Sequence, residues 1–232
     1  MALVKYGGGI VQMSGSVAGN THARNRFGNY IRARTKPINP NTAKQVLVRA
    51  CVANLSARWA QTLSAAQRAA WDLYGASVAM KNKLGETVYL TGYNHYIRSN
   101  SWFARMGRTL VDDGPTVFEL PAQDPTMSIT ISEATQQVTM TFDDTLDWCS
   151  EDNSMLVILQ SQGQNPQRNF FAGPWTGRSA KVGASGVPIT SPMDYASITV
   201  VSELQRVWAK FRILRADGRL SEAFTANCFC AA

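Results

Sequence analysis

The sequence is poor in the residues that most catalytic and metal sites require. Its 232 residues include two histidines, His22 and His95, and four cysteines that form no CxxC pair. Structural zinc usually takes four nitrogen or sulfur ligands at close spacings. The chain also contains no GxSxG, GxxxxGK[ST], GxGxxG or HExxH motif. The sequence therefore predicts no metal, no cofactor and no small-molecule substrate, and it favours a protein that is not an enzyme.

Long apolar runs are also missing. No window reaches the roughly 18 continuous apolar residues that a membrane helix requires, and the first residues lack the apolar core of a secretory signal. About 45% of the residues are apolar and 17% are charged, a composition typical of a globular chain. We therefore expect a soluble protein that is neither exported nor bound to a membrane, with Cys51, Cys149, Cys228 and Cys230 as buried or free thiols.

Acidic residues are scarce in the first half of the chain. Residues 1–110 hold 15 basic and two acidic residues, Asp72 and Glu86, for a net charge of +13. Residues 111–232 hold 8 basic and 14 acidic residues, for a net charge of −6. Such a division indicates modules that face different partners.

The first 40 residues contain no acid and are rich in Gly, Ser and Asn. Gly15, Gly19 and Gly28 interrupt any helical period. Such a segment buries too little apolar surface to offset its ordering entropy, so we predict an extended basic arm over 1–40. It would become ordered only against its own domain, an acidic protein surface or nucleic acid. The side chains expected to bind this partner are Arg24, Arg26, Tyr30, Arg32, Arg34 and Lys36.

Residues 41–110 predict a module of about three helices. Two capping boxes, Thr42 to Gln45 and Ser64 to Gln67, each indicate the start of a helix, and the two helices meet almost without a linker. One face of the first helix is apolar at Val48, Cys51, Val52, Leu55 and Trp59. The third helix carries the stripe Tyr93, Tyr96, Asn100 and Phe103, in which Asn100 is expected to be a buried hydrogen-bonding residue.

From Pro115 onward the apolar period changes from that of a helix to two. Alternation of apolar and polar residues predicts strands near 127–132, 137–142 and 207–213. Continuous apolar runs predict further strands at 155–159 and 197–201. The Asp217-Gly218 pair predicts a hairpin turn before a strand over 220–229. About seven short strands without a helical stripe predict an antiparallel β-sandwich over residues 111–232. The fold class is therefore α+β in several parts.

The segment from Val207 to Ser221 resembles the last hairpin of fibronectin type III-like domains. It combines an alternating strand, an Asp-Gly turn and a serine. The resemblance implies an immunoglobulin-like sandwich, a frequent adhesion and display module, and implies no chemistry.

Five acidic residues crowd one predicted loop between strands: Asp143, Asp144, Asp147, Glu151 and Asp152. Calcium favours oxygen-rich loops, but this loop lacks the spacing and the glycine of an EF-hand. A solvated loop, or an acidic patch that meets the basic arm of another subunit, is the favoured interpretation. Gly173-Pro-Trp175 marks a second loop, whose tryptophan is expected to fold back onto the sandwich.

Several segments of residues 10–107 resemble hypothetical proteins found among tailed-bacteriophage structural genes. They are Ser14 to Gly19, Arg24 to Gly28, Arg32 to Pro40, Gln45, Arg49, Trp59, Leu63 to Trp71, and Leu90 to Asn100. The resemblance implies a virion component that assembles in the host cytoplasm and supplies no catalytic residues. The expected partners are other virion proteins and copies of the chain itself.

The sequence thus predicts a non-enzymatic structural subunit of a tailed-bacteriophage virion, in the capsid, neck or tail. It would assemble through its basic arm and helices, because surfaces of opposite charge attract. The alternative is a nucleic-acid-binding protein that uses the arm and helices. A helix-turn-helix would place the third helix on DNA, but that helix has no clean polar face.

Overall fold

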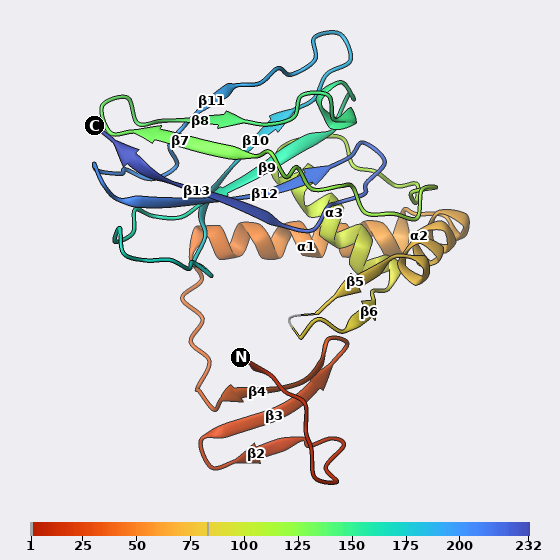
Figure 1. Cartoon of the computed structure of the whole chain (residues 1–232). Coiled ribbons are helices and arrows are strands. Elements are labelled where there is room, and N and C mark those ends of the chain that lie inside the picture. The colour runs from red at the N-terminus through yellow and green to blue at the C-terminus, as the bar shows by residue number, and fades with distance from the viewer. Residues whose placement is uncertain (1, 83) are drawn as a thin grey trace. The chain divides into compact units, whose positions relative to one another are not determined.

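The computed structural model describes residues 2–82 and 84–232 (Figure 1). Three α-helices and three β-sheets are present in this described part, and all strand pairs but one are antiparallel. The α+β class expected from the sequence is confirmed. The chain divides into two compact units, Met1–Ile97 (unit 1) and Arg98–Ala232 (unit 2). This division falls inside the third helix, whereas the sequence placed module boundaries near 40 and 110.

Residues near the N-terminus form a small four-stranded sheet, where the sequence predicted an extended arm over 1–40. Its strands, in the spatial order β1-β4-β3-β2, are β1 (Ala2–Leu3), β4 (Gly28–Ala33), β3 (Asn20–Asn25) and β2 (Gly15–Val17). Two tight turns make the sheet possible, because Ala18 and Gly28 adopt positive φ values of 50° and 115°. The prediction of an extended arm is therefore wrong for the strand residues, while residues 34–42 do lack regular structure.

The first two helices begin at the capping boxes found in the sequence, and the third helix contains the predicted stripe. They are α1 (Ala43–Gln61), α2 (Ala65–Ser77) and α3 (Gly92–Arg105). Thr42 and Ser64 are the N-caps of α1 and α2, and each forms a complete capping box with the glutamine three residues later. These boxes satisfy backbone N–H groups that would otherwise have no partner at the helix start.

An aromatic cluster holds the helices of unit 1 together. Trp71 is fully buried and meets Tyr74 and Tyr96 edge-on, at ring-centroid distances of 6.0 and 5.7 Å. The N-terminus of α3 lies so close to α2 that a Cβ on Gly92 would come within 2.4 Å of the Trp71 backbone. A short hairpin, β5 (Ala79–Lys81) with β6 (Thr87–Tyr89), connects α2 to α3.

Unit 2 is built on a curled seven-stranded sheet in the order β10-β9-β12-β13-β7-β8-β11. The strands are β7 (Ser128–Ser132), β8 (Gln137–Thr141), β9 (Met155–Gln160), β10 (Thr176–Val182), β11 (Met193–Ala196), β12 (Arg206–Leu214) and β13 (Phe224–Ala231), with a 3₁₀ turn η1 (Asp147–Cys149) before β9. The two halves of the sheet are joined through two parallel residue pairs between β13 and β7. The predicted strand at 197–201 is not formed, since β11 ends at Ala196.

The core of unit 2 lies between the two halves of the sheet. Ile131 and Met140 from one half pack in the same cluster as Ile158, Phe211 and Cys230 from the other. Alternation along β12 places Val207, Ala209, Phe211 and Ile213 in this cluster, as the sequence indicated. The four cysteines form no disulfide, which agrees with the thiols expected from the sequence.

The end of α3 packs against the other face of β9 and β12. Phe103 is buried with Met155, Val157 and Leu214. Asn100 is completely buried, and its amide donates to the carbonyl of Val111 and accepts from the N–H of the same residue. The expectation that Asn100 has a structural hydrogen-bonding role is confirmed.

Arg206 fastens the long connection between β9 and β10 to the sheet. Its guanidinium lies over the rings of Trp208 and Phe229, 5.0 and 5.2 Å from their centroids, and it donates to the carbonyl of Arg168. Phe171 stacks on Trp208 and meets Trp175 edge-on. The Gly173-Pro-Trp175 loop therefore does fold back onto the sheet.

Candidate interaction surfaces

The predicted partner-binding side chains lie on the small sheet of unit 1 and the segment that follows it. Arg24 and Arg26 belong to β3 and its turn, while Tyr30 and Arg32 belong to β4. Residues paired across an antiparallel sheet share a face. Tyr30 pairs with Ala23 and Arg32 with Thr21, so these two side chains lie on one face and Arg24 lies on the other. The sheet therefore does not gather all the predicted residues on a single surface.

The predicted partner-binding cations of this region have no acidic neighbours among the residues that the structure describes. Arg24 donates to the Gln12 side-chain carbonyl at 3.0 Å, and Arg26 donates to the Tyr89 backbone carbonyl at 2.9 Å, both of them neutral oxygens. The other three predicted cations, Arg32, Arg34 and Lys36, are exposed and contact no carboxylate within residues 2–82 and 84–232. A Lys5–Glu86 ion pair at 2.7 Å is found beside this group. The uncompensated charge makes the region attractive to a negatively charged partner.

The first three turns of α1 carry apolar side chains that are exposed. The apolar period of the sequence did not predict this exposure. Val46, Leu47, Val48 and Val52 remain 38–49% exposed, and among the described residues Leu55 is the first buried one in the chain. The second half of α1 is covered by α3, where Trp59 contacts Tyr93 and Tyr96. The apolar period indicated one continuous face along the helix. It does not indicate which part of that face is packed against another element and which part is exposed.

The third helix is not available to read DNA. His95, Tyr96, Ser99 and Asn100 are all buried. Arg98 is also occupied, since it donates to the carbonyls of Leu220 and Ser221. A recognition helix needs free polar side chains along one face, so α3 does not offer the helix-turn-helix arrangement considered from the sequence.

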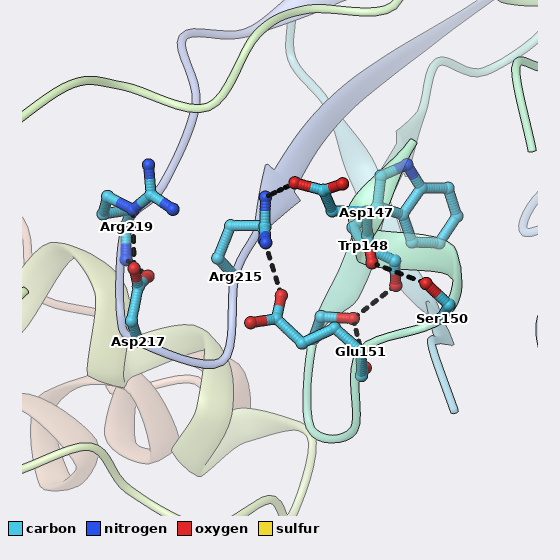
Figure 2. Close-up of polar contacts among 8 residues, drawn as sticks. Asp147, Trp148, Ser150, Glu151, Arg215, Asp217 and Arg219 are labelled. Carbon is cyan, nitrogen blue, oxygen red and sulfur yellow. Dashed lines mark hydrogen bonds and ion pairs between the residues drawn. The ribbon is translucent and has the colours of Figure 1, made fainter. Parts of the chain in front are cut away.

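The predicted acidic loop is partly neutralised by Arg215 (Figure 2). This side chain, 19% exposed, is 2.9 Å from the carboxylate of Asp147 and 2.5 Å from that of Glu151. Nearby on the same hairpin, Arg219 pairs with Asp217 at 2.6 Å. The two Arg215 ion pairs connect the turn after β12 to η1 and the residues that follow it, so Asp147 and Glu151 serve the structure of unit 2.

Four other carboxylates at this edge of unit 2 are bound to neutral donors instead; we call Asp124, Asp143, Asp144 and Asp152 the acidic end. Asp152 accepts from both the N–H and the hydroxyl of Ser185, and these bonds lower the pKa of Asp152. Hydrogen bonds from the Thr145 hydroxyl and N–H lower the pKa of Asp143 in the same way. The negative charge of the acidic end is therefore stable and has no cationic partner among the described residues.

Cys149 lies at the centre of the acidic end. Burial, followed by the charges of Asp144, Asp143 and Asp124, raises the pKa of this thiol to about 12. The loop over residues 184–189 closes on the same residue, because Ala184 and Ile189 both donate to the Cys149 carbonyl. Val187, at the tip of this loop, is 80% exposed. The acidic end thus combines carboxylates with an apolar side chain.

No three His, Cys, Asp or Glu side chains within the described part of the chain are arranged to hold a metal ion. The carboxylates of the loop that was considered for calcium accept hydrogen bonds from N–H groups and hydroxyls or pair with Arg215. Among the residues described, no helix has the length and apolar character needed to cross a membrane.

No protein-family model and no curated protein sequence matches the chain. Among the solved structures that are similar to the chain, two align with it at a TM-score of 0.31. One is a family 76 glycoside hydrolase from a bovine Bacteroides thetaiotaomicron strain, 12% identical, with 47% of this chain and 20% of that one aligned. The other is a Fn3-like protein from Clostridium thermocellum, 11% identical, with 48% of this chain and 95% of that one aligned. The chain therefore spans only a fifth of the hydrolase, and TM-scores below 0.5 assign neither a fold nor an activity.

Proposed function

We propose that the protein is a non-enzymatic structural subunit of a tailed-bacteriophage virion, with an immunoglobulin-like or fibronectin type III-like β-sandwich in unit 2. One observation carries the proposal that it assembles. Exposed cations without carboxylate partners lie in unit 1, while carboxylates without cationic partners lie at the acidic end of unit 2. Surfaces of this kind favour association between molecules, since each charge gains its partner only on docking.

The virion assignment itself is supported by the resemblance of residues 10–107 to proteins of phage structural genes. A mass-spectrometric inventory of purified particles, with the copy number of this chain, tests it directly. Copies near a multiple of the capsid lattice would indicate decoration, and six or twelve would indicate a ring in the neck or tail. Absence from the particles would reject the proposal.

The alternative, binding to nucleic acid, is favoured only by the uncompensated cations Arg32, Arg34 and Lys36. Phosphate contacts by such residues give an affinity that falls steeply with salt. Titration of the full chain into arbitrary duplex DNA at several salt concentrations separates the two functions. Tight binding with a steep salt slope supports the alternative, and weak binding at moderate salt favours assembly between proteins.

A further inference from the structure

We propose that the exposed half of α1, residues 43–54, docks onto the acidic end of unit 2 in a second copy of the chain. This inference rests on the proposed assembly function and names the two surfaces that meet. One surface is a basic, acid-free helix with uncovered apolar side chains. The other is a group of uncompensated carboxylates around an exposed valine.

The exposed half of α1 continues a stripe that is already used for packing. Leu55 and Trp59 occupy the covered part, and Cys51, Val52 and Val48 lie four, three and seven residues before Leu55 on the same face. Val48 and Val52 are nevertheless 40% and 38% exposed. Most of the stability of a helix in a protein comes from packing of its apolar face. Val48 and Val52 therefore remain partly uncovered, although they continue a face that is packed further along the helix.

The charges on α1 determine what kind of surface can cover this face. The helix contains Lys44, Arg49 and Arg58 but no acidic residue. Arg49 donates to the side-chain carbonyls of Asn41 and Asn39 at 2.8 and 2.6 Å, so its charge stays uncompensated. Two copies of α1 packed on each other would bring these cations together without any carboxylate. A partner surface with carboxylates beside an apolar contact is the complementary one.

The acidic end of unit 2 meets both requirements. Asp144 and Asp152 are exposed, and their oxygens accept from Ser191 and Ser185 rather than from a cation. Val187 lies on the loop that Asp152 holds through Ser185, so an apolar side chain is available beside the charges. Because the two surfaces differ, the contact is head-to-tail and propagates from copy to copy into a ring or a filament.

The apolar part is tested by sedimentation velocity of the full chain at low salt, about 50 mM, where surface charges are least screened. Replacing Val48 and Val52 together by Ala keeps the helix and removes two methyl groups from each of two positions on the exposed apolar face, so we expect association to weaken about tenfold. Leu73→Ala is the matched control, because Leu73 is 56% exposed on α2, outside the proposed contact. Equal weakening by the control, or none by the double variant, would overturn the inference.

The identity of the partner surface is tested by exchanging charges. Lys44→Glu and Asp144→Lys should each abolish association when studied alone, while an equimolar mixture of the two variants should associate again. In the mixture the wild-type helix of Asp144→Lys meets the wild-type acidic end of Lys44→Glu, and the altered helix of Lys44→Glu meets the altered acidic end of Asp144→Lys. A mixture that remains monomeric would show that the acidic end of a second copy is not what covers α1.

These results are distinguishable from failure of the proposed function. If wild-type chain remains monomeric at low salt up to high micromolar concentration, docking between copies is rejected, whereas the particle inventory still decides whether the protein is a virion component. If wild-type chain associates but the α1 variants associate equally well, assembly stands and the surface named here is wrong.

Discussion

The stretch before Leu55 and the sheet of unit 2 are organised in opposite ways. None of the described residues before Leu55 is buried, whereas four successive residues of β9, Met155 to Ile158, are at most 1% exposed. Residues 1–71 also hold ten basic residues and no acid, while unit 2, with 11 basic and 14 acidic residues, is slightly negative. The N-terminal stretch is therefore stabilised mainly by backbone hydrogen bonds between strands and by helix caps. The sheet of unit 2 is stabilised mainly by the burial of apolar side chains. Burial and uncompensated positive charge are thus concentrated in different regions.

The largest difference between the regions should appear on truncating aromatic side chains. Phe211 is fully buried in the core of unit 2, so Phe211→Ala should lower the free energy of unfolding by about 3–5 kcal/mol. Tyr30 on the small sheet is only half-buried, and Tyr30→Ala should cost less than about 1 kcal/mol. Native-state hydrogen exchange, followed separately in β12 and β4, measures both. Equal costs would remove the contrast.

A second test concerns the contact between α2 and α3, where unit 1 does depend on close packing. Gly92→Ala would place a Cβ 2.4 Å from backbone atoms of Trp71 and Asp72, which cannot give way without separating α3 from α2. We expect a loss of about 2–3 kcal/mol, measured by chemical denaturation followed through tryptophan fluorescence. Gly19→Ala, where the added Cβ meets nothing within 4 Å, is the control and should change stability by less than about 0.5 kcal/mol.

The Arg215 ion pairs allow the contribution of a partly buried ion pair in unit 2 to be compared with that of an exposed ion pair in unit 1. Arg215→Met keeps the length of the side chain but removes the partner of Asp147 and Glu151. Because Arg215 is mostly buried and the carboxylates are partly exposed, a loss of about 1–2 kcal/mol is expected. Lys5→Met, which removes an exposed ion pair in unit 1, should have almost no effect on stability in the same denaturation assay.

The smallest expected effect concerns pH. The folded state lowers the pKa of Asp152 through hydrogen bonds from Ser185, so this carboxylate stabilises the fold above its ordinary pKa near 4. That contribution disappears as the pH falls through the lowered value. Asp152→Asn should therefore flatten the decline of the melting temperature below about pH 4. Glu119→Gln is the control, because its carboxylate accepts no hydrogen bond in the described part of the chain. An unchanged slope for Asp152→Asn would contradict the expectation.

Local patterns in the sequence predicted the helices and most of unit 2. Thr42 and Ser64 cap helices through side-chain bonds that depend on residues three positions away, and alternation along β12 directly reports which side is buried. The small sheet was missed because its strands bury no apolar face. Its two hairpins turn at Ala18-Gly19 and Arg26-Phe27. These residue pairs were recognised as turns only from the strand pairing in the structure.

The site was less predictable than the fold. The sequence shows that Arg24 and Arg32 have no acidic neighbours along the chain, but their placement on opposite faces depends on strand register. The exposed half of α1 depends on where α3 ends its contact with α1, a long-range property that no helical period contains. The same holds for the acidic end, which is completed by Ser185 and Ser191 from distant loops.

The fastening of the β9–β10 connection by Arg206 has a consequence for proteolysis. One guanidinium bonds to Arg168, Asn169 and Asn227 while lying over two rings, a set of contacts that a lysine cannot reproduce. Local opening of this connection therefore requires the loss of the Arg206 contacts and of the Phe171 stacking on Trp208, but not melting of the sheet beneath it. Proteolytic cleavage after the exposed Phe170 would report this local opening. The rate of cleavage would not depend on the free energy of unfolding of the rest of unit 2.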